Sequence, residues 1–162
     1  MNILRKITGL SICLFVCLAT GAQNKLHIEK LFDDYGKREG SILIELGKDV
    51  LGTHTQITYY KSLIISADSQ MEKIIRETIQ KDIVEGKMLI ESTRNGVVDK
   101  AYYYYPENKK GNSSYEYILF TMQKTKMTLV LVKGNFPPDQ LQDELEKLKK
   151  LFIKVNNERI KL

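Results

Sequence analysis

The stretch YEYILFTMQKTKMTLVLVKG, residues 115–134, contains two apolar runs separated by a polar turn at Gln123 to Lys126. β-Branched and aromatic side chains of the kind that fill both runs fit the pleated surface of a sheet. The stretch therefore predicts a buried antiparallel hairpin at the floor of a single core. Because successive strand side chains alternate faces, we expect Ile118, Phe120 and Met122 to share the side that helices cover.

A second hairpin is predicted immediately before the first. Two runs, Met88 to Thr93 and Val97 to Tyr105, flank Arg94-Asn95-Gly96, and Asn-Gly tolerates the positive φ angles of a type I′ turn. We expect Glu107 to Ser114 to form a polar loop between the two hairpins. The four consecutive strands predict an antiparallel meander.

Two further strands are predicted from apolar runs in the first half of the chain. They cover Ser41 to Leu46 and Thr55 to Ile65, with a helical turn expected at Lys48 to Leu51. Together with the two hairpins they make a sheet of about six strands. Outside the hairpins the order of the strands stays open.

Three amphipathic helices are predicted from apolar residues spaced three and four apart. The first covers Lys25 to Glu39, and the second starts at Ser66 or Asp68 and ends before Gly86. The third follows Pro137-Pro138, and the end of the chain, Asn156 to Leu162, is expected to fray. The sequence thus predicts an α+β fold, a largely antiparallel sheet with three helices mostly on one face.

The first 22 residues have the order of a secretory signal peptide. Arg5 and Lys6 precede an apolar run from Ile7 to Leu18 that is shorter than the roughly 20 residues a transmembrane helix needs. We expect cleavage after Ala22, with cleavage after Gly21 as the alternative. The mature chain, residues 23–162, is then a single periplasmic or secreted domain with no transmembrane span.

Both cysteines, Cys13 and Cys17, lie in the segment expected to be removed, so the mature chain has no disulfide and no thiolate metal site. Leu14 precedes Cys17 at the spacing of a lipobox, but Val16 stands where a small residue is required. We therefore do not expect a lipoprotein. Without Arg5 and Lys6 the chain keeps 23 basic and 20 acidic residues, interleaved along the helices, and this pattern does not favour nucleic acid as a partner.

Two segments stand out by their motifs: LFDDYG, residues 31–36, at the end of the first helix, and LVLVKGNF, residues 129–136, where an apolar strand runs into Lys-Gly before the closing helix. In these segments the chain resembles a family of small exported Bacteroidota domains of unknown function. The resemblance implies export and an α+β fold, and it implies no activity. Many members look like lipoproteins, and the poor lipobox of this chain departs from that pattern.

The residues needed for common catalytic chemistry are not grouped in the sequence. His27 and His54 lack metal-ligand spacing, and neither a nucleophile elbow nor a phosphate-binding glycine loop occurs. Asp33 and Asp34 are adjacent on a helix, so their side chains point apart. We expect no cofactor, no metal and no enzyme activity. A small periplasmic hydrolase acting on envelope material, with His54 and nearby acids as working groups, is the alternative.

Tyrosines form the one unusual cluster, and they are the candidate binding residues: Tyr102, Tyr103, Tyr104, Tyr105, Tyr115 and Tyr117. Alternation along a strand places Tyr102 and Tyr104 on one face and Tyr103 and Tyr105 on the other. Tyrosine combines a large apolar ring with a polar tip and often anchors interfaces. We expect an exported, non-enzymatic binding module that uses an uncovered tyrosine-rich face for a protein, peptide or glycan of the cell envelope. The alternative role for the tyrosines is to cover the sheet by cross-strand pairing.

Overall fold

The computed structural model describes residues 26–109 and 112–159, without the side chains of 107–109, 112–113 and 152–159. It is an α+β fold built on one antiparallel sheet, as the sequence predicts. The strands are β1 (Ile42–Gly47), β2 (Ile57–Ser66), β3 (Lys87–Arg94), β4 (Val97–Lys109), β5 (Asn112–Gln123) and β6 (Lys126–Gly134). The helices are α1 (Ile28–Tyr35), α2 (Lys48–Leu51), α3 (Ser69–Ile83) and α4 (Leu141–Arg159), with a short 3-10 helix η1 (Pro138–Gln140) leading into α4. The predicted signal peptide lies outside the described residues.

The strands follow the order β1-β2-β6-β5-β4-β3, so the hairpin of β5 and β6 is central. Both predicted hairpins are confirmed, and Asn95 and Gly96 at the β3–β4 turn have φ angles of 53° and 76°. The predicted loop at Glu107 to Ser114 is wrong at both ends, because Glu107 pairs with Ser114 and Asn108 with Ser113. Ladder hydrogen bonds use backbone groups that every non-proline residue carries, so polar side chains at a hairpin end do not stop the strands.

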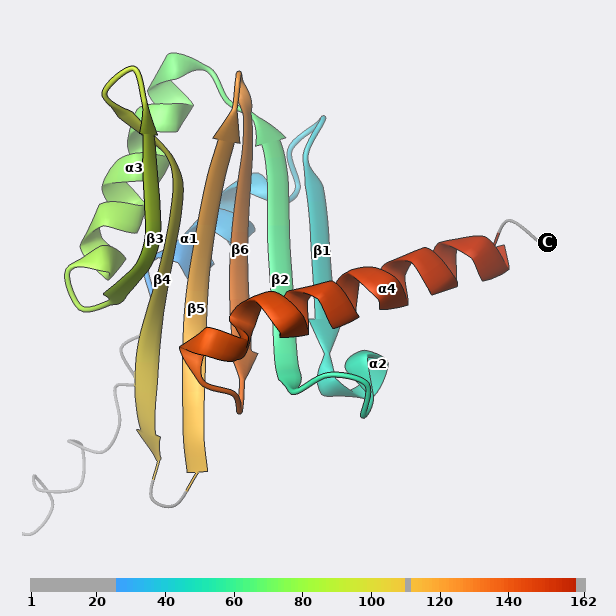
Figure 1. The fold of residues 1–162 in the computed structure, drawn as a ribbon. Helices are drawn as coiled ribbons and strands as arrows, with labels where there is room; N and C mark the ends of the chain where they lie inside the picture. The colour runs from blue at the N-terminus through green and yellow to red at the C-terminus, as the bar shows by residue number, and fades with distance from the viewer. Residues whose placement is uncertain (1–25, 110–111, 160–162) are drawn as a thin grey trace, which may run out of the picture.

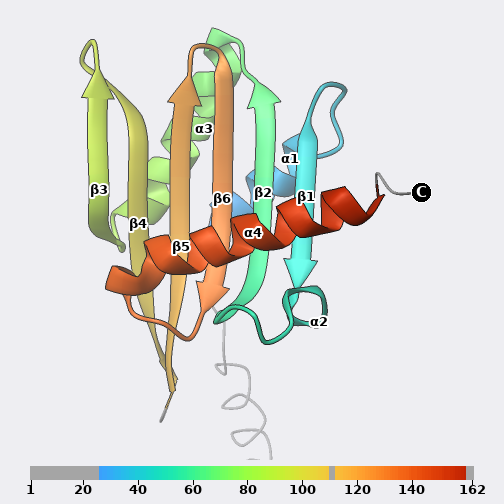
Figure 2. The same cartoon turned by 45° about the vertical axis from the view of Figure 1, so that its right-hand side comes forward.

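Helices cover both faces of the sheet. In Figures 1 and 2, α1 and α3 lie behind the sheet and α4 crosses in front of it toward and past β1. Two of the three longer helices thus share one face and the third covers part of the other. Among the described residues no helix is long and apolar enough to cross a membrane.

Each face therefore has its own core, where one core was expected. The cluster under α1 and α3 includes Phe32, Leu63, Ile75, Ile118, Phe120 and Leu131, and the cluster under α4 includes Ile57, Tyr117, Leu119, Val132, Phe136 and Leu148. Adjacent residues of β5 alternate between the two clusters. A strand that is buried on both faces has a continuous run of apolar residues, and the two strands within residues 115–134 show this pattern.

The turn after β6 positions α4. Tyr117 stacks on Phe136 with ring centroids 5.1 Å apart, and its hydroxyl donates a hydrogen bond to the Phe136 carbonyl. Gly134 is required here, because a Cβ atom at this position would meet the Phe136 ring and would lie 2.9 Å from the Gln56 carbonyl. The Lys-Gly step at the end of β6 thus lets the chain fold back so that α4 can cross the sheet.

Two buried carboxylates join elements that are distant in sequence. Asp82, at the end of α3, accepts hydrogen bonds from the backbone N–H groups of His27 and Ile28 at 2.8 Å each, and so caps α1. Glu144, in the first turn of α4, accepts from the Thr55 hydroxyl at 2.6 Å and from the Gln56 N–H at 2.7 Å. These bonds fix α1 to α3 and α4 to the start of β2.

Candidate functional site

The structure distributes the six candidate tyrosines over both faces of the sheet. Tyr103 and Tyr105 lie on the face covered by α1 and α3, and the other four lie on the α4 face. Burial and a hydrogen bond to Glu91 raise the pKa of Tyr103 to about 12. Tyr105 donates to the backbone carbonyl of Asp82 at 2.7 Å, and burial raises its pKa as well.

On the α4 face, Tyr117 is fully buried, whereas its three neighbours are only half-buried. We call these three, Tyr102, Tyr104 and Tyr115, the tyrosine surface. The rings of Tyr104 and Tyr115 are 6.3 Å apart, and Tyr115 is 6.2 Å from Tyr117, so the row is continuous with the core. The face that the sequence predicted to be uncovered is thus partly covered by α4 and partly open.

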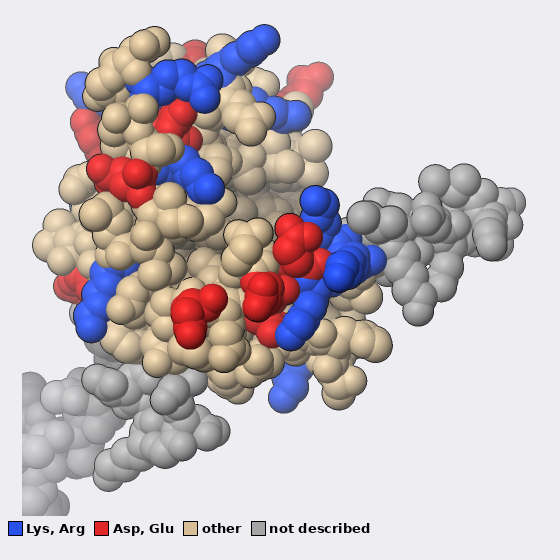
Figure 3. Space-filling view, viewed as in Figure 1, with Lys and Arg blue, Asp and Glu red and all other residues tan. Residues whose placement is uncertain are grey.

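Two lysines and the edge strand border the tyrosine surface. The ammonium group of Lys100 lies 4.7 Å from the ring centroid of Tyr102, and that of Lys87 lies 5.9 Å from the ring centroid of Tyr104. Ile90 of β3 is opposite Tyr102 in the register and is 42% exposed. Figure 3 shows this side of the molecule, where a broad region without charged residues is hollowed above α4. The open part of the face combines aromatic rings, an aliphatic side chain and two cations.

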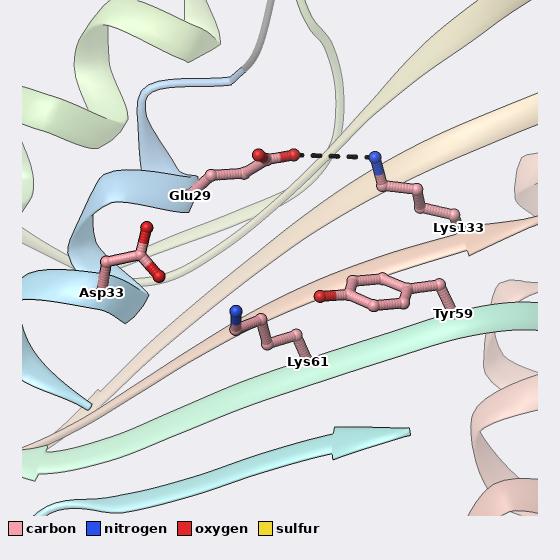
Figure 4. Close-up of a pocket in the computed structure, with 5 residues that line it drawn as sticks. All are labelled: Glu29, Asp33, Tyr59, Lys61 and Lys133. Carbon is pink, nitrogen blue, oxygen red and sulfur yellow. Dashed lines mark ion pairs between the residues drawn. The ribbon is translucent and has the colours of Figure 1, made fainter. Parts of the chain in front are cut away.

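A second concave site lies on the opposite face, between α1 and the sheet. It is a pocket of about 490 Å³ lined by Glu29, Asp33, Tyr59, Lys61 and Lys133. Figure 4 shows the two carboxylates extending from α1 and the tyrosine and lysines extending from β2 and β6. Residues four apart on a helix, or two apart on a strand, share a face. Glu29 and Asp33 therefore lie on one face of α1, and Tyr59 and Lys61 lie on one face of β2.

Carboxylates hold the lysines of this charged pocket in place. Lys61, whose side chain is 15% exposed, pairs with Glu45 at 3.1 Å, and Lys133 pairs with Glu116 at 2.6 Å. Glu29 is a longer partner of Lys133, at 3.7 Å. The Tyr59 hydroxyl donates to Glu45 at 2.7 Å. The lysines thus have fixed positions and still present their ammonium groups to the pocket.

Tyr59 is the residue of this pocket whose pKa is raised. Burial raises the pKa of Tyr59 first, followed by the hydrogen bond to Glu45 and the nearby charges of Glu45, Glu29 and Asp33. No pattern in the sequence predicts this pocket as a whole. The signal it offered was Lys61 within the apolar strand Thr55 to Ile65, because a charge inside such a run marks a side chain that needs a polar partner.

The two histidines lie apart. His27 bonds to Asp82 through Nδ1 at 2.8 Å, and His54 is exposed in the loop after α2. In the part of the chain that the structure describes, no hydrogen bond joins either histidine to a serine, and no group of three His, Cys, Asp or Glu residues could hold a metal ion.

The chain matches the model of a protein family. The model of a family of unknown function, DUF6108, covers residues 15–145. This range includes every strand of the sheet, helices α1 to α3 and the first turn of α4. Among curated proteins, none matches the chain.

Proposed function

The chain belongs to this family of unknown function, DUF6108, and we propose that it is an exported, non-enzymatic module that binds a component of the cell envelope through its tyrosine surface. The ligand is a protein, peptide or glycan. The observation that carries the proposal is that α4 leaves Tyr102, Tyr104 and Tyr115 half-buried on its face of the sheet, with the rings of Tyr104 and Tyr115 in contact.

Aromatic rings that are half-buried in a rigid sheet suit binding. The sheet fixes their orientation, so little side-chain entropy is lost when a ligand packs against them. Their hydroxyl groups and the neighbouring Lys87 and Lys100 supply polar contacts at the rim. Tyr103, Tyr105 and Tyr117 have structural roles instead, because each is held in a core by a hydrogen bond.

Replacing Tyr102 and Tyr104 together by alanine is expected to reduce capture of the envelope ligand at least tenfold, because truncating two aromatic anchors typically costs more than about 2 kcal/mol of binding free energy. The measurement is affinity capture from envelope extract followed by identification of the retained component. A matched control replaces two exposed valines elsewhere, Val50 and Val84, by alanine.

The double tyrosine variant also loses packing against the core under α4, so its fold must be checked by circular dichroism. A second variant, Lys87→Glu with Lys100→Glu, changes the rim of the same surface and leaves the rings in place. Equal recovery of every retained component by the folded variants and the wild type would overturn the proposal.

The export part of the proposal predicts that the mature protein begins at Gln23, or at Ala22 if cleavage follows Gly21. N-terminal sequencing of the protein isolated from its own cells tests this expectation. A chain that begins at Met1 would contradict it.

A further inference from the structure

The sheet has two outer edges, β1 and β3, and they differ in the features that keep an edge strand from pairing with another chain. Bulges and charged side chains are common means of protecting an edge. The ladder of β3 with β4 has register shifts, and β3 carries Lys87, Glu91 and Arg94. β1 pairs with β2 without a register shift, and its one charged residue is Glu45. A further strand is therefore more easily added at β1.

The outward backbone groups of β1 have no partner in the part of the chain that the structure describes. β1 ends the sheet, and no backbone hydrogen bond outside its ladder with β2 involves a residue of this strand. Alternate N–H and C=O groups of an edge strand point away from its neighbour and can pair with the backbone of an added strand. The side chains of Ile42 and Leu43 are 51% and 37% exposed. β1 thus offers both hydrogen-bonding groups and apolar surface to a partner.

Helix α4 extends beyond this edge of the sheet. It crosses in front of β1 and ends past it (Figures 1 and 2). Leu46 and its ladder partner Tyr60 pack in the core under α4, so alternation places Ile42 and Ile44 on the same face. A strand added at β1 would continue this face toward the end of α4. We therefore expect its residues on the α4 face to be aliphatic.

The other face of β1 carries a fixed negative charge. Glu45 accepts a hydrogen bond from the Tyr59 hydroxyl at 2.7 Å and pairs with the Lys61 ammonium group at 3.1 Å. These two hydrogen bonds hold the pKa of Glu45 below its ordinary value, so the carboxylate is charged at neutral pH. The side chain is still 50% exposed, and a carboxylate can accept more than two hydrogen bonds. A lysine or arginine opposite Glu45 on an added strand would complement it.

The position of α4 favours a peptide over a second copy of the chain as the occupant of this edge. Residues directly opposite in an antiparallel pair share a face, so a second copy joined through its own β1 would carry its α4 on the same face of the joined sheet. Each α4 would then extend over the edge at which the other lies. A peptide strand brings no such helix.

We propose that β1 binds an extended peptide segment of a partner protein, which adds to the sheet as a further antiparallel strand. The segment carries aliphatic residues at alternate positions on the α4 face and a lysine or arginine opposite Glu45. Its direction follows the rest of the sheet, in which every pair is antiparallel, the slightly more stable arrangement. The inference does not depend on the tyrosine surface, which lies on β4 and β5, away from this edge.

The test titrates the mature chain with the peptide acetyl-Thr-Val-Lys-Val-Val-Ile-Thr-amide, whose lysine lies opposite Glu45 when its first valine lies opposite Leu46. Binding is followed by the NMR amide signals of β1. We expect these signals to shift saturably and alternate amides of β1 to exchange more slowly with solvent. A peptide with glutamate in place of the lysine should bind about fivefold more weakly, because like charges then lie directly opposite.

Two N-methylated peptides test for strand addition itself. One carries methyl groups on the odd-numbered backbone amides and the other on the even-numbered ones. Only one edge of an added strand donates to β1, so one methylated peptide should bind at least about tenfold more weakly and the other almost normally. Equal affinities of the two methylated peptides would overturn the proposal, as would the absence of any shift in the β1 signals up to the solubility limit of the parent peptide.

Glu45→Gln should keep peptide binding and remove most of the preference for lysine over glutamate. Glu91→Gln is the matched control, because Glu91 lies on the other edge strand and also accepts a hydrogen bond from a tyrosine hydroxyl. It should keep the full preference, and equal effects of the two substitutions would contradict the assigned register. The Tyr102 and Tyr104 double variant should bind the peptide normally, so the two proposals can fail separately. A free chain that sediments as a dimer with the alternate β1 amides already protected would assign the edge to a second copy and overturn the proposal.

Discussion

Replacing Glu144 by glutamine is expected to lower the free energy of unfolding at neutral pH by about 3 kcal/mol. The Glu144 carboxylate is 1% exposed and accepts hydrogen bonds from Thr55, Gln56 and Lys147. An amide cannot accept from all of these donors, because one of its ends is itself a donor. Urea denaturation of the variant and the wild type measures the loss.

The pH dependence of stability provides an independent check of the same contact. Burial raises the pKa of Glu144, but hydrogen bonds from Lys147, Thr55 and Gln56 outweigh it and lower the pKa from 4.5 to about 2. Because protonation then favours the unfolded chain, this contribution is complete above about pH 5 and disappears as the pH falls from 4.5 to about 2. The stability difference between wild type and Glu144→Gln should shrink over this window.

The exposed neighbour Glu146 supplies the matched control, since Glu146→Gln removes the same charge from the same turn of α4. It should change stability by less than about 0.5 kcal/mol. Equal effects of the two substitutions, or a difference from wild type that is constant between pH 7 and pH 2, would contradict the role assigned to Glu144.

Replacing Asp82 by alanine should lower the free energy of unfolding by about 3 kcal/mol. The carboxylate is 4% exposed, and α1 has no side-chain cap of its own at His27. Removing it leaves the N–H groups of His27 and Ile28 without their acceptor at the buried start of α1. Chemical denaturation gives the total loss, and hydrogen exchange should show that the amides of α1 lose protection first.

Two substitutions separate the parts of this cap. His27→Ala removes only the ring contact to Asp82 and keeps both backbone donors, so it should cost about 1 kcal/mol or less. Glu85→Gln, at an exposed residue just beyond α3, should be neutral. If Asp82→Ala were no more destabilising than His27→Ala, the cap would not hold α1 in place.

Much of the fold follows from local patterns in the chain. Asn95-Gly96 identifies one hairpin, Asp68 caps α3 through a hydrogen bond to the Met71 N–H, and the apolar runs of β5 and β6 identify the centre of the sheet. These features depend on residues within a few positions of one another. Local propensity and alternation are sufficient to predict them.

Contacts that join distant segments of the chain could not be predicted from local sequence patterns. Asp82 and His27 are 55 positions apart, and Glu144 and Gln56 are 88 apart, so no spacing rule connects them. Glu144 lies in the polar first turn of α4, and nothing in the sequence around it indicates that it is buried. The charged pocket was missed for the same reason, because its two walls come from α1 and from strands β2 and β6.

The tyrosine cluster is an intermediate case. Alternation predicts correctly that Tyr102 and Tyr104 share a face and that Tyr103 and Tyr105 share the other. The path of α4 decides how much of each face stays open, and this path depends on the turn through Gly134 and Phe136. Burial of both faces could have been inferred from the unbroken apolar run at Tyr117 to Phe120.

Site-specific photo-crosslinking tests the proposed binding role of the tyrosine surface most directly. A benzophenone amino acid placed at position 104 is compared in intact cells with the same group at position 84, where Val84 is 78% exposed at the end of α3. We expect a discrete crosslinked product from position 104 and none of that mass from position 84. The same products from both positions, or a discrete product from position 84 alone, would contradict it.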